Sequence, residues 1–127
     1  MSDSEQLKGE ADIAFRAGKL AKARELYVAA LSLRPDWVAV HNNLAMVLRQ
    51  LGNRGGAERH FCRALAVDSD QIGTLSTLGA LLVEQEHLQE AGEILSGARS
   101  LAPDNPGILY NCALLSFAGR QHVSNSS

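Results

Sequence analysis

The sequence has few aromatic residues and few prolines. Aromatic residues make up 5% of its 127 residues, and it contains three prolines. Strands favour aromatic and β-branched side chains, whereas alanine and leucine, which are abundant here, favour helices. This balance argues against a β-sandwich and for closely packed helices.

The sequence also lacks an excess of positive charge and any long hydrophobic run. Its formal net charge is −2, which argues against binding along a nucleic acid backbone. The N-terminal MSDSEQLKGE does not resemble a secretory signal, and the longest apolar runs, such as residues 78–83, are too short to span a membrane. We therefore expect a cytoplasmic protein without a membrane span, with Cys62 and Cys112 as reduced thiols.

Sequence motifs for catalysis are missing as well. No HExxH, GxxxxGK[ST], GxSxG or repeated CxxC motif occurs, and the two cysteines have no metal-type spacing. The histidines share no motif with either cysteine, so we expect them at the surface: His41, His60, His87 and His122. The sequence therefore predicts no enzyme, no catalytic residue, no metal and no cofactor.

The sequence does contain an internal repeat. Shifted by 34 residues it matches itself at several columns with fixed offsets between them, a pattern typical of helical repeats. The columns are Ala11/Ala45/Gly79/Ala113, Ala23/Ala57/Ala91, Tyr27/Phe61/Leu95, Ala30/Ala64/Ala98, Leu33/Val67/Leu101 and Leu44/Leu78/Cys112.

Glycine and proline divide each repeat into two helices. Gly18 and Gly52 fall at turns inside hairpins, where a helix end favours a residue that tolerates positive φ. Pro35 and Pro103 mark the ends of hairpins because proline cannot continue a helix. The predicted helices span about 4–17, 20–33, 37–51, 54–67, 71–84, 88–101 and 105–118.

These columns resemble the tetratricopeptide repeat family, and the string HNNLAMVLRQLGN is similar to bacterial repeats of the protein O-glycosyltransferase type. The resemblance implies an all-α fold: a right-handed α-solenoid of three helix-turn-helix hairpins plus a terminal single helix. The solenoid would cover residues 1–119, with repeats at about 4–37, 38–71 and 72–105 and a half repeat at 106–119. Residues 120–127 are expected to form a disordered tail.

The resemblance also implies a concave face that is lined by the first helix of each hairpin and binds a peptide or protein segment. The partner-binding residues carried over by alignment are Lys8, Asp12, Phe15, Asn42, Asn43, Met46, Arg49, Thr77, Val83 and Asn111. Some family members clamp a peptide's C-terminal carboxylate. Lys8 and Asn43 match that clamp, but Asp12, Gly73 and Thr77 do not, which argues against it.

A second way to bind a peptide would use asparagines. Asn43 and Asn111 share one column, and an amide side chain can pair with a peptide backbone of any sequence. This resembles the asparagine ladder of the glycosyltransferase repeats, although Gly9 and Thr77 occupy the same column. The alternative is that Asn43 is only a solvated residue on a helix face.

The terminal helix has no second helix to cover it. Its apolar residues are Ile108, Leu109, Cys112, Leu114, Leu115 and Phe117. The chain could be an interaction module or the arm of a longer protein, it could form a homodimer through Leu109, Leu115 and Phe117, or the helix could simply be exposed. The predicted function is a protein-interaction module with a scaffold or adaptor role. The alternative is a non-catalytic, substrate-presenting arm of a larger transferase-like enzyme.

Overall fold

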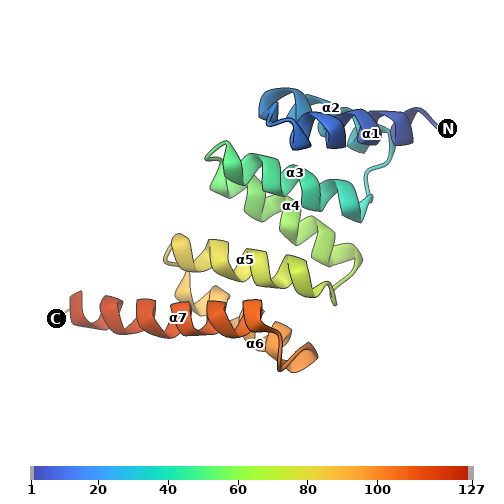
Figure 1. Ribbon diagram of the computed structural model, residues 1–127. Helices are drawn as coiled ribbons and strands as arrows, with labels where there is room; N and C mark the ends of the chain where they lie inside the picture. Colours follow the sequence, from blue (N-terminus) through green and yellow to red (C-terminus); the bar gives the residue numbers. More distant parts are fainter. Residues whose placement is uncertain (1, 126–127) are drawn as a thin grey trace. The chain divides into compact units, whose positions relative to one another are not determined.

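Residues 2–125 fold into seven helices without a strand, as the computed structural model describes them; side chains are described for residues 2–121. The all-α prediction is confirmed, and most helix bounds agree to within one residue (Figure 1). The helices are α1 (Asp3–Arg16), α2 (Leu20–Leu33), α3 (Val38–Gln50), α4 (Arg54–Val67), α5 (Ile72–Glu84), α6 (Leu88–Leu101) and α7 (Pro106–Asn125).

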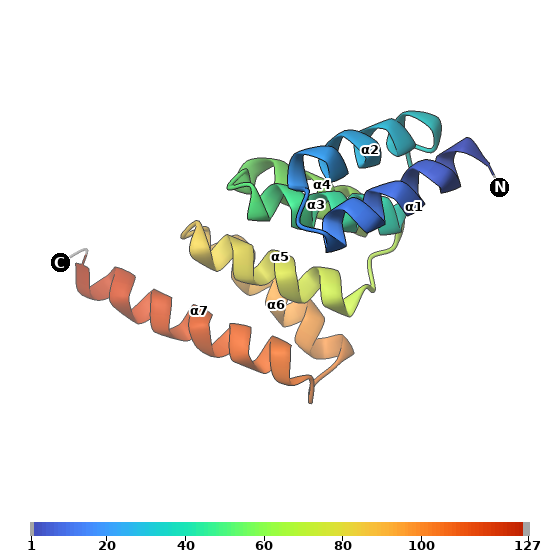
Figure 2. The same cartoon turned by 45° about the horizontal axis from the view of Figure 1, so that its top comes forward.

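The chain divides into two compact units, Met1–Ser69 and Asp70–Ser127. In unit 1, α1 packs against α2, α2 against α3 and α3 against α4, so two hairpins lie side by side (Figures 1 and 2). In unit 2, α5 and α6 form a hairpin, and α7 packs against both of them.

Small side chains allow the two helices of a hairpin to approach closely. Ala11 of α1 and Ala23 of α2 are fully buried, and the ring of Tyr27 fills the space beside them. In unit 2 the approach is closer still, since a Cβ built on Gly79 would lie 2.4 Å from Cδ2 of Leu95. The small-residue columns of the three complete hairpins are therefore packing positions, as predicted, whereas Ala113 of α7 is exposed.

The hairpin turns use a left-handed backbone conformation at one fixed position. Gly18 has φ 77° and Gly52 has φ 86°, both values that glycine adopts without strain. The equivalent residue of the third hairpin is Glu86, with φ 61°. Within residues 2–125 it is the one non-glycine residue with a positive φ, so the third turn keeps the geometry of the others against the preference of its side chain.

The prediction of a disordered tail from residue 120 is wrong for residues 120–125, because α7 continues to Asn125. Gly119 weakens a helix without ending it, and no proline follows it. Residues 126–127 lie outside the described part of the chain. None of the described helices is long and apolar enough to cross a bilayer.

Candidate functional site

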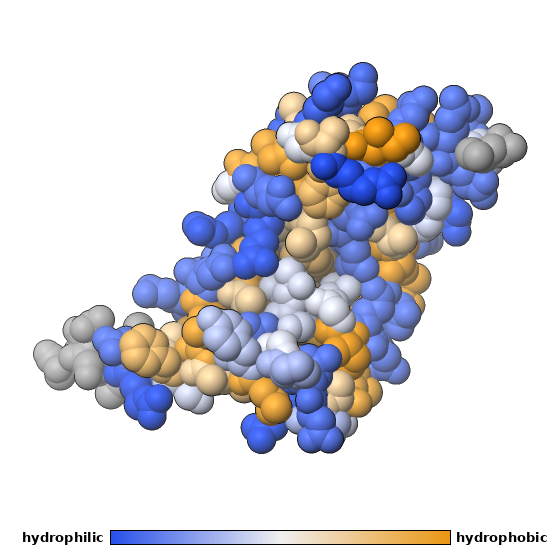
Figure 3. All heavy atoms as spheres, in the orientation of Figure 1, coloured by the Kyte–Doolittle hydropathy of each residue, from blue (hydrophilic) through white to orange (hydrophobic). Residues whose placement is uncertain are grey.

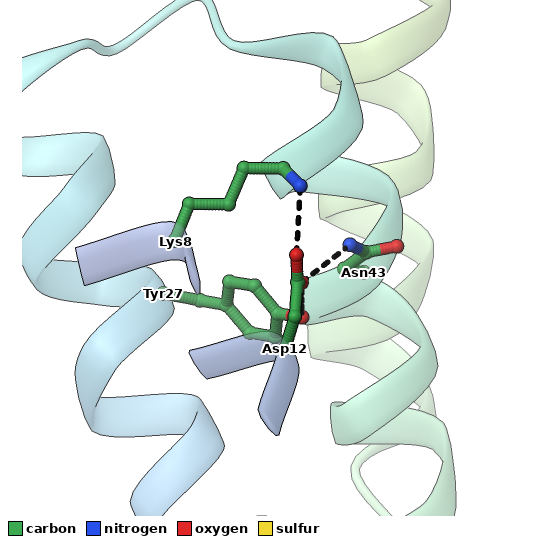
Figure 4. Close-up of polar contacts among 4 residues, drawn as sticks. All are labelled: Lys8, Asp12, Tyr27 and Asn43. Atoms are coloured by element: carbon green, nitrogen blue, oxygen red, sulfur yellow. Dashed lines mark hydrogen bonds and ion pairs between the residues drawn. The ribbon is translucent and has the colours of Figure 1, made fainter. Parts of the chain in front are cut away.

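A cluster of polar side chains surrounds Asp12 in unit 1 (Figure 4). Lys8, one helical turn earlier on α1, donates from Nζ to Asp12 Oδ2 over 2.8 Å. Asn43 of α3 donates from Nδ2 to Asp12 Oδ1 over 3.2 Å, and the Tyr27 hydroxyl of α2 donates to the same oxygen. One carboxylate thus connects three helices, and two of the predicted partner-binding residues, Lys8 and Asn43, converge on a third, Asp12.

The cluster keeps Asp12 ionised. Burial alone would raise the pKa of this carboxyl, but the hydrogen bonds from Lys8 and Tyr27 and the charge of Lys8 outweigh burial and lower the pKa below its usual value. Burial, together with the neighbouring Asp12 carboxylate, raises the pKa of Tyr27. The tyrosine therefore remains a hydrogen-bond donor to a charged acceptor, which is the stronger kind of hydrogen bond.

The same contacts determine which hydrogen-bonding groups of this cluster are still available to a ligand. The Lys8 ammonium is already paired with Asp12, and the Asn43 amide nitrogen is already donating. Lys8 and Asn43 each keep a further N–H, and the Asn43 carbonyl oxygen is an acceptor that has no partner among the described residues. Asn43 is therefore oriented by Asp12 to accept a hydrogen bond, and it is half-buried rather than freely solvated.

Trp37 extends this face, and the sequence reasoning missed it. The Arg34 guanidinium carbon lies 4.2 Å from the centroid of the indole ring, and Lys8 Nζ lies 6.0 Å from it. The side chain is half-buried at the start of α3. Since Trp37 is the one tryptophan of the chain and tryptophan is enriched in binding interfaces, its identity alone was a usable signal.

The other predicted partner-binding residues of unit 1 are not part of the Asp12 hydrogen-bond cluster. Phe15 lies on α1, whereas Asn42, Met46 and Arg49 lie on α3, and all four are half-buried. Asn42 and Arg49 already interact with other groups of the chain. Half-burial leaves each of them a surface that a partner could contact.

In unit 2, the predicted residue Asn111 has a packing role. Its Nδ2 donates to the backbone oxygen and to the hydroxyl of Ser76, both over 2.9 Å, which ties α7 to α5. It is only 8% exposed, so little of it could contact a partner. Thr77 donates to the Gly73 carbonyl of its own helix over 2.9 Å, an ordinary intrahelical bond.

Val83, the remaining predicted residue of α5, lines a hollow in unit 2. The hollow has a volume of about 450 Å³. Its lining is formed by Val83, Glu84, Glu86, Leu88, Phe117, Ala118 and Gln121. Of the residues predicted for self-association, Phe117 is 56% exposed and Leu109 is 39% exposed, whereas Leu115 is half-buried and packs towards Gly92 of α6.

A pair of histidines, His41 of α3 and His60 of α4, lies between the two helices, with His41 buried and His60 half-buried. The expectation that the histidines are surface residues is wrong for His41, which is 3% exposed. Its Nδ1 lies 3.0 Å from Nδ1 of His60, its Nε2 lies 2.6 Å from the Pro35 carbonyl oxygen, and the two rings stack. A carbonyl can only accept, so a neutral His41 donates from Nε2 and accepts at Nδ1 from His60.

The pair was detectable in the repeat alignment. His41 aligns with Leu7 and Leu75, and His60 aligns with Leu26 and Ile94, so one hairpin has two histidines where the others have aliphatic residues. Burial, the neighbouring His41 ring and the charges of Arg63 and Arg59 lower the pKa of His60 to about 4. At neutral pH His60 is therefore uncharged.

Comparison with known proteins agrees with the repeat pattern. The profile of the tetratricopeptide repeat family matches residues 6–70, about half of the chain. Cellulose synthase operon protein C of Xanthomonas axonopodis pv. citri (strain 306) is 38% identical over 85 residues, which are 67% of this chain and 6% of that protein. The chain thus spans a small part of this relative, and the finer resemblance to glycosyltransferase repeats stays a prediction.

Solved structures of the same architecture bind different peptides. The first TPR of Spaghetti (RPAP3), bound to the HSP90 peptide SRMEEVD, is similar with a TM-score of 0.84 and 23% identity, over 91% of each chain. The Yersinia enterocolitica type III secretion chaperone SycD, in complex with a peptide of the translocator YopD, has a TM-score of 0.81 and 19% identity, over 96% of this chain and 97% of that one. At these identities the likeness establishes the fold alone. With its 34-residue columns, its close-packed hairpins and the family match, this chain belongs to the tetratricopeptide repeat family.

Proposed function

We propose that the chain is a non-catalytic interaction module that binds an extended peptide segment of a partner protein. The observation that carries this proposal is the state of Asn43: its amide nitrogen is bound to Asp12, and its carbonyl oxygen is left to accept. Because the amide is held in place, an N–H group of a peptide backbone could bind it at little cost in side-chain ordering. Trp37, Phe15 and Met46 are half-buried and offer apolar contacts beside it.

The ligand we propose is an internal peptide segment rather than a chain end with a free carboxylate. The RPAP3 and SycD domains bind peptides, which supports peptide binding in general. At the Asp12 cluster, however, an incoming carboxylate would face an ionised aspartate whose lysine partner is already engaged. Like charges repel, so the cluster disfavours a carboxylate and tolerates a neutral backbone.

A peptide selection with the purified protein tests this proposal. Random peptides would be displayed in two libraries, one with the peptide inside a longer chain and one with a free C-terminus at the end of the peptide. The dissociation constants of the selected peptides would then be measured by fluorescence polarisation. We expect binding peptides to be selected from the library in which the peptide lies inside a longer chain. Asn43→Ala should weaken them about fivefold to tenfold, the worth of one hydrogen bond, without altering the circular dichroism spectrum.

The matched control is Ser32→Ala, an exposed position on α2 whose hydroxyl bonds only to the Ala29 carbonyl of its own helix. This variant should bind like the wild type. An unchanged dissociation constant in Asn43→Ala, or winners that all require a free C-terminus, would remove the proposal in this form.

A second candidate function is a substrate-presenting arm of a larger transferase-like protein. The observation in its favour is the 38% identity to a segment that makes up only 6% of a much longer relative. Sequencing the gene beyond codon 127 separates the two functions. A reading frame that continues into a catalytic domain supports the arm, and a stop codon supports a free adaptor.

A further inference from the structure

The indole ring of Trp37 lies near two cations, and the chain neutralises one of them. The Arg34 guanidinium carbon lies 4.2 Å from the ring centroid, and Lys8 Nζ lies 6.0 Å from it. Lys8 forms an ion pair with Asp12, in which Nζ lies 2.8 Å from Oδ2. Among the residues whose side chains the structure describes, none forms an ion pair or a side-chain hydrogen bond with Arg34, although Asp36 is only two positions away.

The contact with Trp37 positions the Arg34 guanidinium without using its N–H groups. Arg34 is exposed, whereas Trp37 is half-buried at the start of α3. The face of an aromatic ring attracts a cation, while the five N–H donors of a guanidinium lie in its own plane. Two of these donors match the two oxygens of a carboxylate. Arg34 therefore offers an acidic side chain a cation that is already in place.

The charge of unit 1 favours the same kind of ligand. Residues 1–69 contain ten lysines and arginines against eight aspartates and glutamates, whereas residues 70–127 contain two against six. The unit that carries Arg34 therefore attracts an acidic segment. In the space-filling view, blue hydrophilic side chains border orange apolar ones over unit 1, in the upper half of the picture, so a ligand there meets both kinds of contact (Figure 3).

Arg34 is close enough to Asn43 for one extended peptide to reach both. Trp37, which Arg34 contacts, precedes Asn43 by six positions, and a helix rises about 9 Å over six residues. An extended peptide covers that distance in about three residues. Lys8 joins the two positions, because it lies near the Trp37 ring and pairs with the carboxylate that orients Asn43.

We infer that Arg34, held against Trp37, is a binding site for an aspartate or glutamate side chain of the bound peptide segment. The inference rests on the proposed function, because it adds a second contact about three to five residues along the peptide from the one at Asn43. The acidic side chain binds at Arg34 and not at the Asp12 cluster, where the charge of Lys8 is already paired. The ligand is thereby narrowed from any extended segment to one with a carboxylate at a fixed spacing.

The probes for the test are the peptides selected from the library in which the peptide lies inside a longer chain. We expect an aspartate or glutamate at one fixed position in these peptides. Arg34→Gln should raise their dissociation constants about fivefold to tenfold, because a charge-assisted hydrogen bond is lost. The matched control is Arg24→Gln, which removes the same charge from an exposed position of α2 and should change the dissociation constants less than about twofold.

A double-mutant cycle separates a direct contact from an effect of overall charge. Replacing the acidic residue of the peptide by its amide should weaken binding to the wild type about as much as Arg34→Gln does. The two changes together should weaken binding little further, because each removes the same interaction. Circular dichroism confirms that each variant is folded.

Three results would overturn the inference: peptides without an acidic residue at a fixed position, equal effects of Arg34→Gln and Arg24→Gln, or additive effects in the cycle. Peptides that depend on Asn43 but not on Arg34 would support the proposed function and remove this inference. Peptides that depend on Arg34 but not on Asn43 would do the reverse. If neither library yields a binding peptide, both are overturned.

Discussion

Asp12 connects three helices through one side chain. It accepts hydrogen bonds from Lys8 and Asn43 and from the Tyr27 hydroxyl, and through them it fixes the orientation of the Asn43 amide. Asp12, which differs from the residue that carboxylate-binding members of the family have at this position, is therefore the centre of the hydrogen-bond cluster. We expect this difference to exclude a free carboxylate from the face, and the peptide selection described above tests that expectation.

From the histidine pair we predict that the free energy of unfolding depends on pH. The pKa of His60 is about 4 in the folded chain, against the ordinary histidine value of 6.5 in the unfolded chain. Between these two pH values the unfolded chain therefore binds a proton that the folded chain does not. Stability from this group is fully present above about pH 6.5 and is lost as the pH falls towards 4. Urea unfolding between pH 4.5 and 7.5 should show a slope of at most about 1.4 kcal/mol per pH unit from this one proton.

The matched variant is the double substitution His41→Leu with His60→Leu, which recreates the pair Leu7 and Leu26 of the first hairpin. Its unfolding free energy should depend less on pH over that range than that of the wild type. Equal slopes in the two proteins would show that His60 is not the group that titrates.

At the scale of the helices, the fold could be predicted from the sequence because it depends on spacing. The 34-residue columns place small residues where the two helices of each hairpin meet, and six of the seven helices end within about one residue of their predicted bounds. The end of α7 was missed because Gly119 is a weak signal by itself: with a proline behind it the helix would stop, and without one it continues.

The polar site was less predictable, for a physical reason. Alignment placed Lys8, Asp12 and Asn43 on one face, but it did not predict their contacts. Their hydrogen bonds depend on rotamers and on a further residue, Tyr27, whose column indicated only packing. Asn111 was selected by the same column as Asn43 and instead binds Ser76. Equivalent positions in successive repeats have the same backbone conformation. The hydrogen-bond partners of a polar side chain, in contrast, depend on the residues that surround it.

The close approach of α5 and α6 leads to a prediction about the free energy of unfolding. Gly79→Ala should lower the free energy of unfolding by about 1–3 kcal/mol, because its new Cβ would lie 2.4 Å from Leu95 Cδ2 and the leucine would have to move. Gly97→Ala on α6, with nothing within 4 Å, should instead stabilise by about 0.5–1 kcal/mol. Chemical denaturation of both variants checks the two signs, and destabilisation of similar size in both would contradict the packing explanation.

At the scale of the whole chain, each unit has its own core, and this has a spectroscopic consequence. The single tryptophan, Trp37, lies in unit 1, so its fluorescence follows the unfolding of that unit, whereas circular dichroism follows the helices of both. Gly79→Ala lies in unit 2. It should lower the midpoint seen by circular dichroism more than the midpoint seen by Trp37 fluorescence.

Coincident shifts in the two signals would contradict this expectation and show that the chain unfolds as one cooperative body. Gly97→Ala serves as the control, since it also lies in unit 2 and should raise the circular dichroism midpoint.

The contact between Gly79 and Leu95 also restricts how this repeat can evolve. A larger residue at position 79 has no space until position 95 becomes smaller, and a smaller residue at position 95 leaves a cavity until position 79 becomes larger. Each single step is less stable than either end point. The two positions are therefore expected to change together, and a lineage that crosses from one combination to the other needs stability in reserve.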